Sequence, residues 1–123
     1  MILGVGIDIV EIQKIEESIQ SDAFLRKVFT SDELMVVERY VKRAEHLAGK
    51  FAAKEAFMKA IGAGIRQDVW FTQIEVLNED SGKPYLDVSG EAEVRLNECG
   101  AKHVHVSVSH SAGVAVAVVI LEG

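Results

Sequence analysis

The sequence predicts a single compact α+β domain over residues 1–123, in which an antiparallel sheet packs on one long helix and several shorter ones. Strand-type alternation occurs at both ends of the chain, and helical periodicity fills most of its first half. The sequence has no internal repeat, low-complexity tract or Pro/Gly linker that would divide it. With 123 residues, the chain is long enough to bury a core without disulfides or structural metal.

The first element is a strand over residues 1–10, MILGVGIDIV. Period-two alternation puts four apolar residues on one side and two glycines, a carboxylate and a valine on the other: Leu3, Val5, Ile7 and Ile9 against Gly4, Gly6, Asp8 and Val10. Asp8 therefore shares its side with two glycines, which we expect to leave open space beside it.

Helical segments follow this strand. One helix is predicted from Ile12 to Phe29, and the spacing of Thr30 and Glu33 is that of a capping box, which predicts a second helical stretch. A long helix is expected from His46 to Ile61, ended by the glycines of GAG at 62–64.

The second half of the chain predicts two hairpins. Strands at 69–77 (VWFTQIEVL) and 85–89 (YLDVS) flank the turn NEDSGKP, and strands at 102–110 and 114–121 flank the turn SAG. Between the hairpins, Ser89 can cap a helix that runs to Cys99 and is stopped by Gly100.

Composition excludes several classes of protein. The net charge of −6 argues against a general nucleic-acid-binding protein, although residues 38–66 carry seven Lys/Arg against three Glu. The single Cys99 cannot form an internal disulfide, which is typical of a reducing compartment. The N-terminus lacks a basic leader, and the apolar VAVAVVIL is far shorter than the roughly 20 residues of a membrane helix. We therefore expect a cytoplasmic protein that does not bind membranes.

Glu55 departs from the pattern of its helix, FAAKEAFMKA, because its neighbours on the same side are mostly apolar. A carboxylate there loses solvation unless a cation or hydrogen bonds replace the water. An i,i+4 pair with Lys59 at the edge of the core is the simplest explanation. Alternatively, Asp8 and Glu55 together supply two oxygen ligands of the kind that Mg²⁺ accepts while it binds substrate phosphates.

The stretch HVHVSVSH places His103, His105, Ser107 and Ser109 on one side of a strand and the valines with His110 on the other. Such a polar row is usual for the solvated face of an antiparallel sheet. Imidazole and hydroxyl groups also donate hydrogen bonds to phosphate oxygens. The sequence contains no G-x-x-x-x-G-K-[ST] loop, no complete G-x-G-x-x-G, no G-x-S-x-G, and no second His/Cys pair for a zinc site.

Three segments in register resemble the holo-acyl-carrier-protein synthase family of phosphopantetheinyl transferases: GVGIDIVEI at 4–12, AGKFAAKEAFMKAIGAGI at 48–65 and VHVSVSHS at 104–111. The order, the spacing and the SGKPYL turn also fit, so the resemblance spans nearly the whole chain and implies one phosphopantetheinyl transferase domain over 1–123. It implies transfer of 4′-phosphopantetheine from coenzyme A to a serine of apo acyl carrier protein. It also implies that adenosine 3′,5′-bisphosphate is released and that the reaction supports fatty acid biosynthesis.

The resemblance also assigns site residues. It implies Mg²⁺ held by Asp8 and Glu55, and Lys59 positioned to neutralise charge on the transferring phosphoryl group. His105, with Lys50 as a helper, would contact a phosphate at the nucleotide end of coenzyme A. Lys50 stands where members usually have arginine, so it keeps the charge and loses the bidentate geometry.

Further expectations from the resemblance are less direct. Ser107, Ser109 and His110 rank below His105 as contacts to coenzyme A. The family implies a homotrimer with active sites between subunits. An acidic carrier protein would dock on basic residues of the first helix: Lys14, Arg26 and Lys27.

Two other functions fit parts of the sequence. A noncatalytic nucleotide-binding or carrier-binding module could keep this fold, although the presence of both Asp8 and Glu55 argues against it. A Mg²⁺-dependent hydrolase of a nucleotide diphosphate is chemically close, and it differs in whether pantetheine ends on a protein serine or in water.

Overall fold

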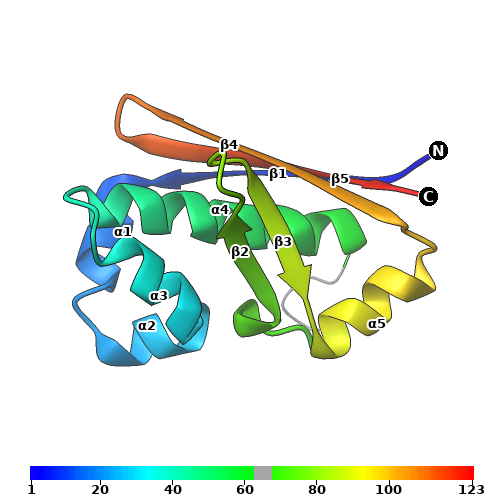
Figure 1. The fold of residues 1–123 in the computed structure, drawn as a ribbon, viewed down its shortest axis with the longest axis horizontal. Coiled ribbons are helices and arrows are strands. Elements are labelled where there is room, and N and C mark those ends of the chain that lie inside the picture. Colours follow the sequence, from blue (N-terminus) through cyan, green and yellow to red (C-terminus); the bar gives the residue numbers. More distant parts are fainter. Residues whose placement is uncertain (63–67) are drawn as a thin grey trace.

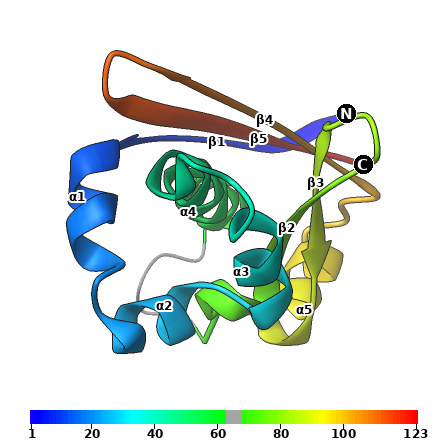
Figure 2. The ribbon, with the colours of Figure 1, turned by 60° about the vertical axis from the view of Figure 1, so that its left-hand side comes forward.

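The structure is a computed structural model that describes residues 1–62 and 68–123. Its main sheet has three antiparallel strands in the order β1-β5-β4, and a long helix, α4, lies along one face (Figure 1). A second sheet is the hairpin β2–β3, and short helices lie at both ends of α4 (Figures 1 and 2). The predicted α+β class, with a compact antiparallel sheet packed on one long and several shorter helices, is confirmed. The strands are β1 (Ile2–Glu11), β2 (Ile74–Asn78), β3 (Pro84–Val88), β4 (His103–Ser111) and β5 (Val114–Glu122), and the helices are α1 (Ile12–Ser18), α2 (Asp22–Val28), α3 (Ser31–Val37), α4 (Arg43–Ile61), the 3₁₀ turn η1 (Phe71–Gln73) and α5 (Gly90–Glu98).

The glycine side of β1 is the side that packs on α4. A Cβ atom added at Gly6 would overlap the backbone carbonyl oxygen of Ala56, and one at Gly4 would overlap that of Ala60. The space at the two glycines is therefore filled by the backbone of α4, and the open space beside Asp8 is instead a cavity on the side of α1 and α2. The glycines let helix and strand approach more closely than any side chain would allow.

The apolar side of β1 faces away from α4 and is exposed. The exposed fractions of Leu3, Val5, Ile7 and Ile9 are 39%, 57%, 60% and 65%. The predicted alternation is confirmed, with the small residues in the core and the large apolar residues outside. We call these four residues the outer row.

The predicted helix over 12–29 is two helices, so that prediction was wrong. The chain leaves α1 after Ser18, and Ser21 begins α2 as its N-cap, with its hydroxyl accepting a hydrogen bond from the Phe24 amide at 3.3 Å. The capping box of α3 is confirmed: Thr30 Oγ1 accepts from the Glu33 amide, and Glu33 Oε1 accepts from the Thr30 amide.

Helix α4 begins at Arg43, three residues before the predicted start, and ends at Ile61, where Gly62 is the C-cap with a left-handed φ of 71°. The other glycine of the predicted GAG stop, Gly64, lies outside the described residues. The side of α4 toward the main sheet is rich in alanine, and Ala48, Ala52 and Ala56 are fully buried. These small side chains complement the glycines of β1.

The middle hairpin is confirmed, but its first strand begins at Ile74 because residues 71–73 form η1. The Gln73 side chain fixes this turn: its Oε1 accepts from the Trp70 amide and from the Ala92 amide, each at 3.2 Å. Ser89 is the N-cap residue of α5 as predicted, yet its side chain makes no capping hydrogen bond. The last hairpin, β4–β5, turns at Ala112 and Gly113 as predicted. Among the described residues, no helix combines the length and apolarity needed to cross a membrane.

Candidate functional site

Asp8, Glu55 and Lys59 lie together where β1, an edge strand of the main sheet, meets α4. Lys59 Nζ donates to Asp8 Oδ1 and to the Ile7 carbonyl oxygen, both at 3.0 Å. Lys59 is thus paired with Asp8 on the strand. The simple explanation of Glu55 by an i,i+4 pair with Lys59 was wrong.

The Glu55 carboxylate is partly buried, and within residues 1–62 and 68–123 no hydrogen bond or ion pair to it is found. Burial raises the pKa of Glu55 above its usual range, and the neighbouring Asp8 carboxylate raises it further, while Lys59 partly offsets both effects. A cation between the two carboxylates would relieve both the burial cost and the repulsion.

Asp8 and Glu55 line the same cavity, of 510 Å³, between β1, α1, α2 and α4. Its polar lining also includes Lys14 and Ser18, and its apolar part is built around Phe24 and Phe51, whose ring centroids are 6.1 Å apart. The cavity therefore joins a charged end to an aromatic wall. A larger hollow of 960 Å³ beside α1 is lined by Glu11, Glu16 and Glu17, and none of its described lining residues is a cation, so phosphate would bind poorly there.

The carboxylates of Asp8 and Glu55 are suited to a Mg²⁺ ion that also binds substrate, and they are too few to form a metal site from protein ligands alone. In the described part of the chain, no group of three or more His, Cys, Asp or Glu side chains could hold a metal. A cation at Asp8 and Glu55 would have two protein ligands and take its remaining oxygen ligands from water or a phosphate, as Mg²⁺ commonly does.

Lys50 is separated from this group. Only 6% exposed, it donates from Nζ to the Val76 carbonyl oxygen at 2.6 Å. Burial lowers its pKa, and the Glu33 and Glu75 carboxylates partly offset this effect. Lys50 lines a second cavity, of 190 Å³, together with His46 and His110.

His105 and Ser107 lie on the other face of the main sheet. Asp8 pairs through Ala117 with Val108, on the face toward α4, whereas His105 pairs through Ile120 with Val5 of the outer row. His105 Nε2 contacts Glu122 Oε1 at 2.9 Å, and this hydrogen bond lowers the pKa of Glu122. One chain thus brings Asp8, Glu55 and Lys59 together, and leaves Lys50, His105 and Ser107 apart from them.

Several residues of these cavities carry only a weak signal in the sequence, or none. His110 pairs with Glu45, and His46 stacks on Tyr40 with ring centroids 4.0 Å apart. A signal for His110 was present, because it is the polar residue on the valine side of its strand. Phe24 and Phe51 carried no signal beyond ordinary amphipathic spacing.

Comparison with known proteins gives a consistent result. Residues 4–119 match the family described as the 4′-phosphopantetheinyl transferase superfamily. A holo-[acyl-carrier-protein] synthase of Trichlorobacter lovleyi is 45% identical over 99% of this chain and 98% of its own length. The crystal structure of holo-[acyl-carrier-protein] synthase from Neisseria meningitidis superposes with a TM-score of 0.90 at 35% identity, covering 100% of both chains. The synthase from Bacillus anthracis in complex with CoA (3′,5′-ADP) gives 0.80 at 43% identity, over 98% of this chain and 96% of that one.

Proposed function

The chain belongs to the 4′-phosphopantetheinyl transferase superfamily, among the holo-[acyl-carrier-protein] synthases, and we propose that it modifies an apo acyl carrier protein in a Mg²⁺-dependent reaction. A serine oxygen of the carrier forms a bond to the phosphorus that bears the pantetheine arm of coenzyme A. The bond from that phosphorus to the adenosine 3′,5′-bisphosphate oxygen breaks, and the serine proton is lost. The reaction would take place in the cytoplasm and support fatty acid biosynthesis.

The observation that carries the proposal is the Glu55 carboxylate, which shares a cavity with Asp8 and has no hydrogen-bond or ion-pair partner among the described residues, while Lys59 pairs with Asp8 beside it. Asp8 and Glu55 would hold Mg²⁺, which when bound neutralises charge on the pyrophosphate. Lys59 reaches Asp8 from the next turn of α4. Its ammonium would neutralise charge on the transferring phosphoryl group. Phe24 and Phe51 give the same cavity an apolar wall, which we propose limits the access of water to the reacting groups.

The nucleotide end of coenzyme A is proposed to lie at Lys50. On the same chain, the imidazoles beside Lys50 are those of His46 and His110. His105 and Ser107 face the opposite side of the sheet, so they could meet a coenzyme A molecule only when it is bound by another copy of the chain.

The outer row supports the proposal of a homotrimer with active sites at subunit interfaces. Four large apolar side chains on one strand form a contiguous exposed patch, which in soluble proteins commonly marks an interface. A second copy covering this face would bury the row and bring His105 and Ser107 to a neighbour's site.

Charge in the outer row is expected to break this assembly. Val5→Asp places a carboxylate at the centre of the row, at a position 57% exposed in one chain, so the lone chain should fold. Light scattering should change from three times the chain mass of 13.4 kDa to the chain mass, with loss of transfer. Val41→Asp, at a fully exposed position away from the row, is the control. A Val5→Asp protein that keeps the wild-type mass would contradict this interface.

The reaction itself is tested by the intact mass of an apo carrier protein after incubation with this protein, coenzyme A and Mg²⁺. We expect the carrier to gain one phosphopantetheine, and the gain to stop when EDTA removes the metal. Consumption of coenzyme A with an unchanged carrier mass would instead support the hydrolase, and no consumption at all would support the noncatalytic module.

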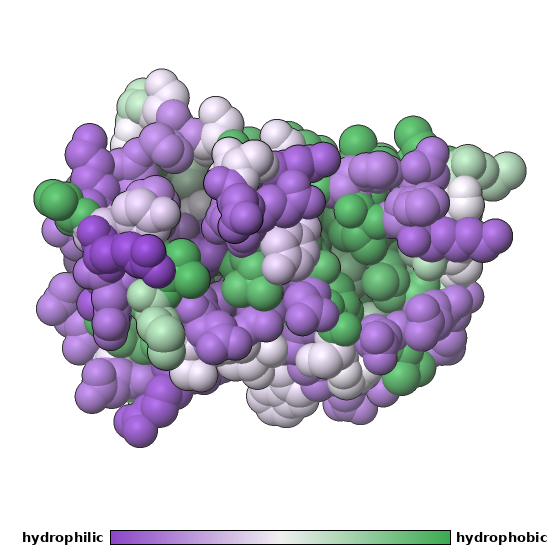
Figure 3. Space-filling view, viewed as in Figure 1, coloured by the Kyte–Doolittle hydropathy of each residue, from purple (hydrophilic) through white to green (hydrophobic). Residues whose placement is uncertain are grey.

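Docking of the acidic carrier is proposed to use Lys14 on α1 and Arg26 and Lys27 on α2. These helices lie at the end of the molecule that Figure 3 shows to be mostly hydrophilic. Reversing all three charges to Glu should raise KM for the carrier and leave KM for coenzyme A nearly unchanged. Added salt should mimic part of the effect, because exposed charges are screened over about 10 Å at 0.1 M. Lys102→Glu is the surface control. A change in KM for coenzyme A with no change in KM for the carrier would show that the carrier docks elsewhere.

A further inference from the structure

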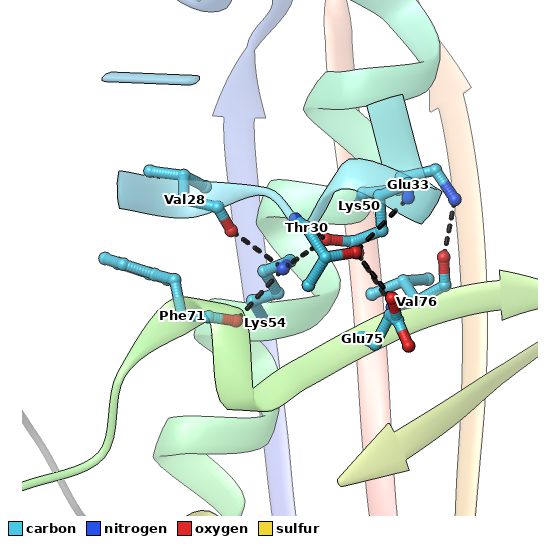
Figure 4. A network of polar contacts seen from close by, with 8 residues as sticks. All are labelled: Val28, Thr30, Glu33, Lys50, Lys54, Phe71, Glu75 and Val76. Atoms are coloured by element: carbon cyan, nitrogen blue, oxygen red, sulfur yellow. Dashed lines mark hydrogen bonds and ion pairs between the residues drawn. The ribbon is translucent and has the colours of Figure 1, made fainter. Parts of the chain in front are cut away.

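Lys54, the residue before Glu55 on α4, is fully buried and uses all of its hydrogen-bonding capacity. Its Nζ donates to Glu33 Oε1 at 2.7 Å, to the Val28 carbonyl oxygen at 2.8 Å and to the Phe71 carbonyl oxygen at 3.0 Å (Figure 4). An ammonium group has three N–H donors, and here each has an acceptor. None of the activities described above requires a cation at this position.

Both carboxylate oxygens of Glu33 also accept hydrogen bonds. Oε1 accepts from Lys54 and from the Thr30 amide, and Oε2 accepts from the Val76 amide at 2.8 Å. The pair therefore connects α4 with the end of α2, the beginning of α3, η1 and β2 (Figure 4).

Two of these connections lead to the walls of the cavity that holds Asp8 and Glu55. Val28 ends α2, the helix that contributes Phe24 to the cavity. Phe71 stacks on Phe51 at 5.5 Å between ring centroids, and Phe51 in turn contacts Phe24. One ammonium group thus holds the backbones of the two segments whose rings flank Phe51.

Stability alone is a weak reason for such a pair. Burying two charges costs several kcal/mol per ion, and apolar residues of similar volume often serve a core as well or better. A charged pair differs from an apolar one in fixing where its partners lie, because carbonyl oxygens must meet the N–H directions. The partners fixed here are the segments that border the cavity.

We propose that Lys54, paired with Glu33, is a positioning residue that holds α2 and η1 at a fixed distance from α4. It thereby sets the opening between the wall on which the carrier docks and the helix that bears Glu55. This inference rests on the proposed function, since it assigns carrier docking to α1 and α2.

The test is a double variant, Lys54→Met with Glu33→Gln, which removes both charges and leaves neither one buried alone. Lys54→Met by itself leaves the Glu33 carboxylate buried without a cation, so this single variant is expected to fold poorly. The matched control is Glu91→Gln with Arg95→Met, which removes a half-buried ion pair on α5. Melting temperature shows whether each variant folds.

In the double variant we expect KM for the carrier to rise about tenfold, the size of one lost charge-assisted hydrogen bond. The kcat should remain within about twofold of wild type, since Asp8, Glu55 and Lys59 are untouched. A folded double variant with unchanged KM for the carrier would overturn the proposal.

Hydrogen exchange supplies a readout that does not need activity. The amides of Leu25 and Phe29 donate to the Ser21 and Leu25 carbonyl oxygens at the two ends of α2. They should exchange about tenfold faster in the double variant, while the amides of β5 keep their rates. If no transfer occurs in the wild type, the proposed function fails while faster exchange confined to α2 still supports positioning. Equal acceleration throughout the chain would show an ordinary loss of stability and overturn the proposal.

Discussion

Replacing Glu55 by glutamine is expected to abolish most transfer while the fold survives. Glutamine keeps the shape of the side chain and removes the charge, and a neutral amide is a poorer Mg²⁺ ligand. Loss of the metal's charge stabilisation should lower the rate by about 100-fold or more. Glu93→Gln, on the exposed side of α5, is the matched control.

The same variant should also differ from the wild type in thermal stability, and the raised pKa of Glu55 determines whether it is more or less stable. Because folding raises that pKa, the wild type is destabilised above the folded pKa, and the penalty disappears as pH falls below the ordinary glutamate range. The glutamine variant should therefore melt at the same or a higher temperature at neutral pH without metal, and lose this advantage in acid. Addition of Mg²⁺ and coenzyme A should raise the melting temperature of the wild type but not that of the glutamine variant. Near wild-type turnover with unchanged Mg²⁺ dependence would remove Glu55 from the metal site.

Gly6→Ala is expected to damage both fold and activity. The new methyl group would overlap the Ala56 carbonyl oxygen and lie 2.8 Å from the Ala60 amide nitrogen, and both are backbone atoms of α4 that cannot change rotamer. The helix must then move away from β1, which we expect to cost about 3 kcal/mol or more in free energy of unfolding. Asp8 and Glu55 lie on the two separated elements, so transfer should fall as well.

Denaturant unfolding and the transfer rate together test this prediction. The control is Gly123→Ala, where the new Cβ would lie 3.0 Å from the end of the flexible Leu3 side chain and 3.3 Å from the Gly100 carbonyl oxygen, neither of which is an overlap like that at Gly6. Wild-type stability for Gly6→Ala would show that helix and strand are less closely packed than the glycines indicate.

The order of strands and helices could be predicted because local patterns determine it. Alternation in residues 1–10 identifies a strand, and Thr30 with Glu33 identifies a helix start. The side of β1 that packs in the core could not be predicted this way. Large apolar residues usually mark the buried side, whereas here the buried side is defined by contact of Gly4 and Gly6 with a helix some 50 residues away.

The site was predictable to the extent that its residues depart from local patterns. Asp8 and Glu55 are carboxylates in apolar surroundings, and the structure brings them together with Lys59. Lys54 lies in the same helix and looks like an ordinary solvated lysine. Its burial depends on Glu33 and on two carbonyl oxygens from distant segments, which no local pattern encodes.

The buried pair of Lys54 and Glu33 also affects how the protein responds to heat. The hydration of ions becomes less favourable as temperature rises, so the cost of keeping these two charges out of water falls on warming. An apolar pair of the same volume gains no such advantage. The contacts that Lys54 and Glu33 make between α2, η1 and α4 should therefore weaken less than those of the apolar core around them. On heating, these segments should be among the last to separate.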